Sequence, residues 1–319
     1  MRFLLDDEQR EFARSLDAML TAADVPAAVR SWGAGDFTAG RALWGRLAEA
    51  GVFALAVPEA YEGVGPLPVE LAVAYVELGR HAVPGPVVET AAVSALLAAS
   101  TDSAHAKRLL PGVADGSVLA TVKAPGGPYA LDAEAADVTV TFADGGLHLC
   151  GAGHGPVHRS ADPARRLTEP GAPTEPLTRD RAAFAATDAW GTLAAAAQAL
   201  GVGRALLDRT VAYVKQRKQF GTPIGTFQAV QHQLANALLR LEFAQPLLYG
   251  AALTMTRADL AAAKLTASEA AYQASRTALQ LHGAIGYTEE LDLSLWIRKA
   301  QALRTAWGTP GECRKRVLA

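Results

Sequence analysis

The sequence predicts a mostly helical protein with a small β region in its middle. Apolar residues recur at helical spacing before residue 110 and again after residue 187. Between these regions, short strand-like runs alternate with clusters of Pro, Gly and Asp, which are typical of turns. We therefore expect an N-terminal helical domain over 1–112, a reduced middle β domain over 113–186 and a C-terminal helical bundle over 187–319.

The N-terminal region is expected to form short helices. Asp6, Asp7 and Glu8 supply an acidic first turn, which suits the positive end of a helix dipole. A further helix should end at Gly51, and an apolar helix follows a turn-rich loop, over about 68–78.

Three strand-like runs define the middle region, at 117–123, 137–142 and 146–150. The later segment Thr168-Glu169-Pro170-Gly171 follows these runs. We interpret it as a proline-rich connection to the helical region.

The C-terminal region is expected to contain three long helices and a shorter one. Their apolar positions span 193–214, 230–241 and 260–281, and the fourth helix covers about 289–304. Pro246 should kink or end the second helix, and Gly283 should cap the third. Small alanines allow close approach, so the pattern favours an antiparallel four-helix bundle.

Composition excludes several classes of protein. With 30 basic and 32 acidic residues, the formal net charge of -2 indicates no broad nucleic-acid or membrane-binding face. The longest uncharged helical stretch, 189–203, is shorter than the ~20 apolar residues of a membrane span. Cys150 and Cys313 form no CxxC pattern, which indicates free thiols and no metal site. Because acids interrupt the first apolar run, we expect no signal peptide and a cytoplasmic protein.

Three segments at the ends of bundle helices carry the strongest functional signal: Arg217-Lys218-Gln219-Phe220-Gly221, Phe227-Gln228 and Gln280-Leu281-His282-Gly283. A guanidinium can form two parallel hydrogen bonds to a pyrophosphate, and an aromatic ring can cover an adenine or ribose. In this order and spacing, the segments resemble the flavin-clasping segments of the acyl-CoA dehydrogenase family. The resemblance implies that five residues bind the adenosine diphosphate half of the FAD of a neighbouring subunit: Arg217, Phe220, Gln228, Gln280 and Gly283.

The expected position of the catalytic base departs from that family. Ala306-Trp307-Gly308-Thr309 matches the Glu-Gly-Thr run in which many members carry a carboxylate that removes a proton alpha to a thioester carbonyl. Other members carry it on the first bundle helix, at the position of Gly191. Neither an indole nor a glycine can accept that proton, so we expect no catalytic residue in this chain.

The loop that contacts the flavin ring in the family also differs. Family members open the β domain with a Thr-Glu-Pro…Gly-Ser loop, whereas this chain has Thr121-Val122-Lys123-Ala124-Pro125-Gly126-Gly127, without the acid and the serine. Ala284 stands where the family usually has a second glycine that lets the backbone approach the cofactor.

Other acids of the C-terminal region have structural explanations. Asp188 is expected to cap the first bundle helix or to lie in its first turn. Glu242 is expected to be a solvated or salt-bridged surface acid, and Glu289 and Glu290 an acidic pair at a helix start.

The resemblance implies the non-catalytic subunit of a heteromeric, FAD-dependent acyl-CoA dehydrogenase. In the α2β2 members that desaturate steroid-derived CoA thioesters in actinobacteria, one subunit supplies the base and the flavin-ring contacts, and a shortened partner completes the adenine side. We therefore expect a longer catalytic partner that binds most of the acyl-CoA, an FAD shared between the two chains, and no activity from this chain alone. Two alternatives stay open: a complete homomeric dehydrogenase with a relocated base, and a flavin-free structural or binding homologue.

Overall fold

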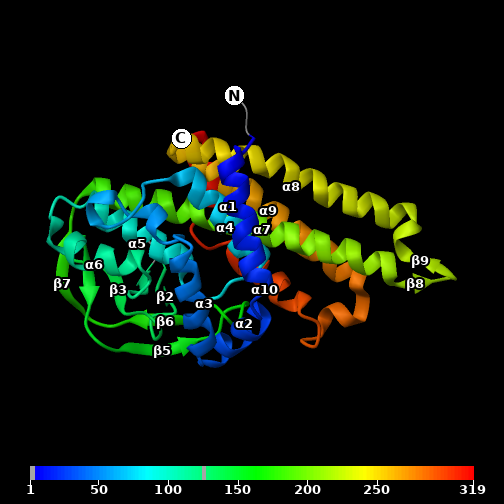
Figure 1. Ribbon diagram of the computed structural model, residues 1–319, viewed down its shortest axis with the longest axis horizontal. Coiled ribbons are helices and arrows are strands. Elements are labelled where there is room, and N and C mark those ends of the chain that lie inside the picture. Colours follow the sequence, from blue (N-terminus) through cyan, green and yellow to red (C-terminus); the bar gives the residue numbers. More distant parts are fainter. Residues whose placement is uncertain (1–3, 124–126) are drawn as a thin grey trace. The chain divides into compact units, whose positions relative to one another are not determined.

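The computed structural model describes residues 4–123 and 127–319 (Figure 1). Two compact units are built from non-contiguous segments of the chain. Unit 1 consists of Met1–Thr21, Ala72–Ala82 and Ala195–Ala319, and unit 2 of Ala22–Leu71 and Val83–Ala194. The three-domain division expected from the sequence stays a prediction.

From residue 4 onward, the N-terminal part contains six α-helices, as its periodicity indicates. They are α1 (Asp7–Thr21), α2 (Val25–Ala34), α3 (Thr38–Glu49), α4 (Pro68–Arg80), α5 (Val87–Ala99) and α6 (Ser103–Ala114). Asp7 and Glu8 form the acidic first turn of α1, as expected, and α4 covers the predicted apolar helix. Two short 3-10 turns, η1 (Ala54–Ala56) and η2 (Glu59–Tyr61), lie in the loop between α3 and α4.

Unit 2 also holds the two small sheets of the middle region. The strands β1 (Ala120–Val122), β3 (Val138–Ala143), β4 (Gly146–Cys150) and β7 (Pro173–Thr178) form a sheet in the order β1-β3-β4-β7, with β1 and β3 parallel. A three-stranded antiparallel sheet has the order β2 (Ala130–Leu131), β6 (Leu167–Pro170), β5 (His154–His158). The predicted runs coincide with β1, β3 and β4.

The segment from Thr168 to Gly171 was predicted to be a connection, and this prediction is wrong. Three of its four residues lie in β6, which pairs with both β2 and β5. Thr168 is buried, and its hydroxyl donates to the carbonyl of Ala130 and accepts from the backbone N–H of Ala133. Pro170 is tolerated because it ends the strand, where a missing N–H costs little. Of the segment matched to the flavin-ring loop, residues 124–126 lie outside the described residues.

Long helices dominate the C-terminal region. They are α7 (Arg181–Gln216), α8 (Gln228–Thr254), α9 (Arg257–His282), α10 (Leu293–Leu303) and α11 (Pro310–Leu318). Between them lie a hairpin of β8 (Lys218–Gln219) and β9 (Thr222–Pro223) and the 3-10 turns η3 (Ile224–Thr226) and η4 (Gly283–Tyr287). Gly283 caps α9 with a φ of 63°, as predicted.

Two local predictions for these helices need correction, and a third is narrowed. Because α7 begins at Arg181, Asp188 lies inside the helix, beyond its cap and its first turn. Pro246 lies within α8, which continues to Thr254, so the helix does not end at the proline, and a kink there stays a prediction. Glu289 and Glu290 precede α10, whose first residue is Leu293.

Small residues let the helices of unit 1 approach closely. A Cβ added to Gly201 on α7 would lie 1.9 Å from the carbonyl oxygen of Val76 on α4. A Cβ added to Gly203 would lie 3.1 Å from the Cα of Ala271 on α9. These contacts explain why glycine and alanine occupy the helix crossings. None of the helices in the described ranges has a stretch long and apolar enough to cross a bilayer.

Candidate functional site

The connection between α7 and α8 is a tight hairpin that carries Phe220 at its tip (Figure 1). Lys218 and Gln219 of β8 pair with Pro223 and Thr222 of β9, and Phe220 and Gly221 form the turn with φ values of 52° and 80°. Two consecutive positive φ angles are typical of a type I′ hairpin turn.

Arg217 precedes this hairpin, directly after the last residue of α7. Its carbonyl accepts a hydrogen bond from the N–H of Ile224 at 2.8 Å, which closes the base of the hairpin. The side chain itself is exposed and has no hydrogen-bond or ion-pair partner among residues 4–123 and 127–319. Its guanidinium is therefore available to an external anion.

The N-terminus of α8 lies at the same hairpin. Gln228 is its first residue, and the preceding Phe227 gives no side-chain cap. An uncapped helix N-terminus has free N–H groups and a partial positive charge, which favour phosphate oxygens. The ring of Phe220 is 95% exposed and contacts that of Phe227 edge-on, with centroids 6.3 Å apart. Cationic groups and exposed aromatic faces thus share one end of the helix.

The end of α9 supplies the other two expected residues. Gln280 is exposed in the last turn, and Gly283 follows the helix. Apart from its chain neighbours, no atom of the described residues lies within 4 Å of the place where a Cβ of Gly283 would be, so the backbone there is open to a ligand. Glycine is required at this position by its positive φ and not by crowding within the chain.

An aromatic stack joins the end of α7 to the end of α9. The rings of Tyr213 and His282 lie 4.1 Å apart at an interplanar angle of 23°. His282 is buried, its Nδ1 is 2.8 Å from the carbonyl oxygen of Ala278, and burial lowers its pKa below 6.5.

All five predicted binding residues therefore lie at one end of unit 1. Their exposed guanidinium, amides, aromatic ring and open glycine fit an adenosine diphosphate group.

The position expected for a catalytic carboxylate holds a buried indole. Trp307 is 7% exposed and lies in the turn between α10 and α11 with a φ of 57°. The fully buried ammonium of Lys264 donates to the carbonyls of Leu303 at 3.0 Å and Gly308 at 3.3 Å, which fixes this turn. Gly191, the alternative base position, lies inside α7. Neither position can provide a general base.

Two of the acids considered from the sequence are engaged in ion pairs. Glu242 lies on the exposed side of α8, 3.6 Å from the guanidinium of Arg204, as expected for a surface acid. Glu289 pairs with Arg298 of α10.

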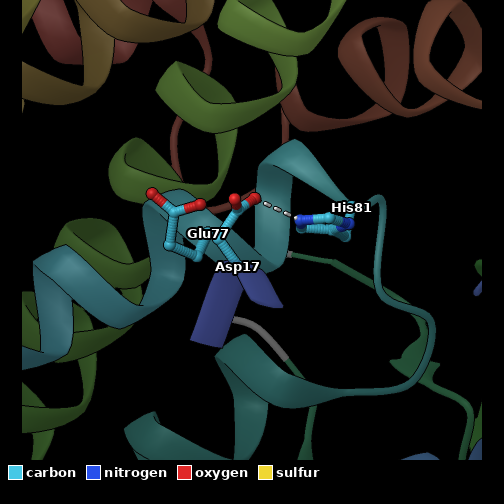
Figure 2. A group of neighbouring side chains, drawn as sticks. All are labelled: Asp17, Glu77 and His81. Carbon is cyan, nitrogen blue, oxygen red and sulfur yellow. Dashed lines mark hydrogen bonds and ion pairs between the residues drawn. The ribbon is translucent and has the colours of Figure 1, made fainter. Parts of the chain in front are cut away.

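Figure 2 shows a cluster that the motifs did not indicate: Asp17, Glu77 and His81. Their ligand atoms lie within 4.8 Å of one another, and His81 Nε2 is 2.8 Å from Asp17 Oδ1. The guanidinium of Arg80 lies 3.4 Å from Glu77 and 4.0 Å from Asp17, so it already supplies positive charge. Burial raises the pKa of Glu77. We assign this cluster to the packing of α1 on α4.

A second unpredicted group is the fully buried carboxyl of Asp132 in unit 2. Burial raises its pKa to about 7, although the N–H of Arg166, which donates to Oδ1 at 3.1 Å, acts in the opposite direction. A carboxyl that titrates near neutrality is a common mark of a functional site. Here the group is enclosed within the unit, and its effect is on stability.

Comparisons with known proteins agree with the motifs. The family model for the N-terminal domain of acyl-CoA dehydrogenases matches residues 6–117, and the model for the C-terminal domain matches residues 185–318. Acyl-CoA dehydrogenase IpdE2 of Mycobacterium tuberculosis is 35% identical over 315 residues, covering 97% of this chain and 96% of that protein. Acyl-CoA dehydrogenase FadE34 of the same organism is 31% identical over 309 residues, covering 89% of this chain but 43% of that protein.

Solved structures show the same fold. The Tcur3481-Tcur3483 steroid ACAD has a TM-score of 0.85 at 25% identity, with 98% of this chain and 96% of that chain covered. The ChsE4-ChsE5 complex from Mycobacterium tuberculosis has a TM-score of 0.83 at 22% identity, with 99% and 98% covered. Together, the two domain matches and the full-length similarity to IpdE2 show that this chain belongs to the acyl-CoA dehydrogenase family.

Proposed function

We propose that this chain is the non-catalytic subunit of a heteromeric FAD-dependent acyl-CoA dehydrogenase. It completes the adenosine diphosphate side of an FAD whose ring is held by a longer catalytic partner. The observation that carries this proposal is the buried indole of Trp307 at the base position, in a unit that also carries the exposed candidate binding residues. The chain offers a candidate cofactor grip but no proton acceptor at either of the two base positions, Trp307 and Gly191.

The binding residues have separate roles in this proposal. Arg217 pairs with the pyrophosphate, and the N-terminus of α8 adds partial positive charge beside it. Phe220 covers the adenine or ribose, the amides of Gln228 and Gln280 offer donors and acceptors, and Gly283 lets the backbone approach. When bound, FAD supplies the hydride acceptor of the desaturation reaction.

The relatives support a partner and a substrate class. ChsE4-ChsE5 is a complex, and Tcur3481-Tcur3483 is described as a steroid ACAD. More than half of FadE34 lies outside the region similar to this chain, so the FadE34 polypeptide has room for a second domain beside that region. We therefore infer an α2β2 assembly that acts on a steroid-derived acyl-CoA bound mainly by the partner. Cys150 and Cys313 form no disulfide, which is consistent with the reducing cytoplasm.

Co-expression tests the proposal. The probe is a longer acyl-CoA dehydrogenase from the same organism, selected for an intact glutamate in its Glu-Gly-Thr run. Alone, this chain should contain little FAD and be poorly soluble or inactive, whereas co-expression should yield a yellow complex with one FAD per heterodimer. Two FAD per heterodimer would contradict the half-site assignment.

The alternatives predict different purified material. If this chain alone carried stoichiometric FAD and desaturated an acyl-CoA, it would be a complete dehydrogenase with a relocated base. A colourless complex with the same partner would instead support a flavin-free structural role.

A further inference from the structure

Four helices of unit 1 border a cleft of about 250 Å³ that the proposed function does not use. Its walls come from α1, α4, α7 and α8, which are labelled in Figure 1, and its lining residues all belong to unit 1. The described residues that line it include neither base position and none of the five residues of the candidate grip. Sites for drug-sized molecules measure roughly 300–1,000 Å³, so this cleft can hold only a small molecule.

One part of the wall is apolar. Leu5 and Ala13 line the cleft at the N-terminal end of the chain, and Val73 and Val76 line it from α4. The two valines are 2% and 3% exposed. Such a wall favours a ligand with a hydrocarbon part, because burial of that part removes apolar surface from water.

The polar part of the wall includes a tyrosine whose hydroxyl is unused. Tyr249 of α8 is 6% exposed, and its hydroxyl makes no hydrogen bond within residues 4–123 and 127–319. Burial raises the pKa of this hydroxyl, which therefore keeps its proton at neutral pH. Buried tyrosine hydroxyls normally have a hydrogen-bond partner. A buried donor at the wall of a cleft indicates that an acceptor within the cleft supplies it.

A guanidinium with free donors lines the same cleft. Arg204 of α7 donates through Nη2 to the side-chain oxygen of Gln245, and the same nitrogen lies 3.6 Å from Glu242. Its Nε and Nη1 make no hydrogen bond in the described part of the chain. The N–H donors of these two nitrogens are therefore available to a carboxylate oxygen.

The one acid of the wall, Glu77 of α4, has a balanced charge. The guanidinium of Arg80 lies 3.4 Å from its carboxyl, and burial raises the pKa of Glu77, which reduces its negative charge further. Arg10 and Arg14 also line the cleft. They pair with acids of their own helix, but such exposed pairs are weak and can rearrange. Hydrogen-bond donors and positive charge therefore dominate the wall, which favours an anion over a cation.

We propose that this cleft binds a small aliphatic monocarboxylate, with its carboxylate on Arg204 and the hydroxyl of Tyr249 and its chain against Val73 and Val76. The inference does not depend on the proposed function, because it uses no residue of the candidate grip. The ligand contacts helices from both ends of the sequence, and its binding therefore stabilises folded unit 1.

Titration with pentanoate tests the chemical class of the ligand. It is followed by ligand-observed NMR on the co-expressed complex, or on this chain alone if no complex forms. We expect saturable binding with a dissociation constant of about 1 mM or below. Pentanol and pentylammonium have the same chain without the anion and should bind at least about tenfold more weakly, and inorganic phosphate, an anion without the chain, should also bind more weakly.

Two outcomes of this titration overturn the proposal. If pentanol or pentylammonium binds as tightly as pentanoate, the cleft does not select a carboxylate. If pentanoate shows no saturable binding up to about 10 mM, ten times the expected dissociation constant, the cleft holds water only.

A variant that fills the cleft locates the bound pentanoate. Ala13 is partly exposed on α1, so Ala13→Leu adds its extra carbon atoms to the cleft and leaves the core of unit 1 unchanged. It should weaken pentanoate binding at least about tenfold. Ala18→Leu adds the same atoms at an exposed position of α1 outside the cleft and should bind pentanoate as wild type does.

Tyr249→Phe removes only the hydroxyl. It should weaken pentanoate binding about tenfold, the loss expected for one hydrogen bond to a charged group, and leave the midpoint of urea unfolding unchanged. Tyr287→Phe, at a tyrosine that is 76% exposed in η4, is the matched control. If pentanoate binds and neither Ala13→Leu nor Tyr249→Phe weakens it, the ligand lies elsewhere and the assignment of this cleft is wrong. If Tyr249→Phe lowers stability and leaves binding unchanged, the hydroxyl has a structural role and does not hold the carboxylate.

Discussion

Replacing Arg217 by alanine should release FAD from the complex without unfolding the chain. The Arg217 carbonyl closes the hairpin, and its N–H donates to the carbonyl of Tyr213 in the last turn of α7 at 2.9 Å. Alanine keeps both of these bonds. The side chain is exposed and has no hydrogen-bond or ion-pair partner in the described part of the chain, so its removal should change folding stability by less than about 0.5 kcal/mol.

The expected loss of affinity follows from the bonds that the guanidinium can make. Hydrogen bonds to charged groups contribute about 1.5–3 kcal/mol each, and a guanidinium can make two in parallel to a pyrophosphate. Loss of one such bond corresponds to roughly 10- to 150-fold weaker binding. We therefore expect the dissociation constant of FAD to rise at least about tenfold.

Fluorescence titration of FAD into the stripped complex measures this change, and sedimentation confirms that the complex persists. Arg257→Ala is the matched control, because Arg257 is also exposed and opens α9 at the opposite end of that 26-residue helix, about 39 Å from the grip. This control should retain wild-type affinity. If the Arg217 variant assembled normally and bound FAD as tightly as wild type, the assignment of the pyrophosphate to this residue would be wrong.

Three further predictions concern buried groups. Trp307→Glu should create no acyl-CoA-dependent flavin reduction, because the ring-contacting loop also differs, whereas removing the glutamate of the catalytic partner should lower turnover at least ~10²-fold. Lys264→Met should lower the free energy of unfolding by about 3 kcal/mol in urea titrations, because backbone carbonyls lose a charged donor, whereas exposed Lys315→Met should not. The pKa of Asp132 is about 7 in the folded chain, against 3.8 for an ordinary aspartate. Between these values the folded chain keeps the carboxyl proton and the unfolded chain does not, so the free energy of unfolding falls as pH rises through this range. Asp132→Asn should remove that loss of stability. The unfolding free energy of the variant, relative to that of wild type, should therefore increase by about 3 kcal/mol between pH 5 and pH 8, or roughly 1.4 kcal/mol for each of two pH units. A difference that does not change with pH would contradict the raised pKa.

Local patterns predicted the elements whose signals lie within a few residues. The apolar period of α9 and the glycine after it predicted both that helix and its cap, and β3 and β4 were found from their strand-like runs. The start of α7 was missed because the alanine-rich turns after Arg181 show little amphipathic contrast. β6 was missed because it is stabilised by pairing with β2, whose residues lie more than 30 positions earlier.

The candidate site also contains residues that local patterns predicted, whereas residues brought together by long-range contacts were missed. Motif order indicated Arg217, Phe220, Gln228, Gln280 and Gly283, and the structure brings them to one end of unit 1. Their binding role stays a prediction. The cluster at Asp17 was not foreseen, because its hydrogen bond to His81 joins residues 64 positions apart and no local spacing reveals it.

The backbone conformation of Phe220 at the hairpin tip affects how the chain can bind a ligand. Most residues other than glycine, asparagine and aspartate avoid the left-handed backbone region, and a bulky side chain there costs about 1 kcal/mol or more. Phe220 adopts a φ of 52° while its ring is 95% exposed, so neither backbone preference nor burial within the chain favours phenylalanine there. Asparagine would suit the turn better. The turn therefore presents the ring to water at a backbone cost that contact with a bound molecule can offset.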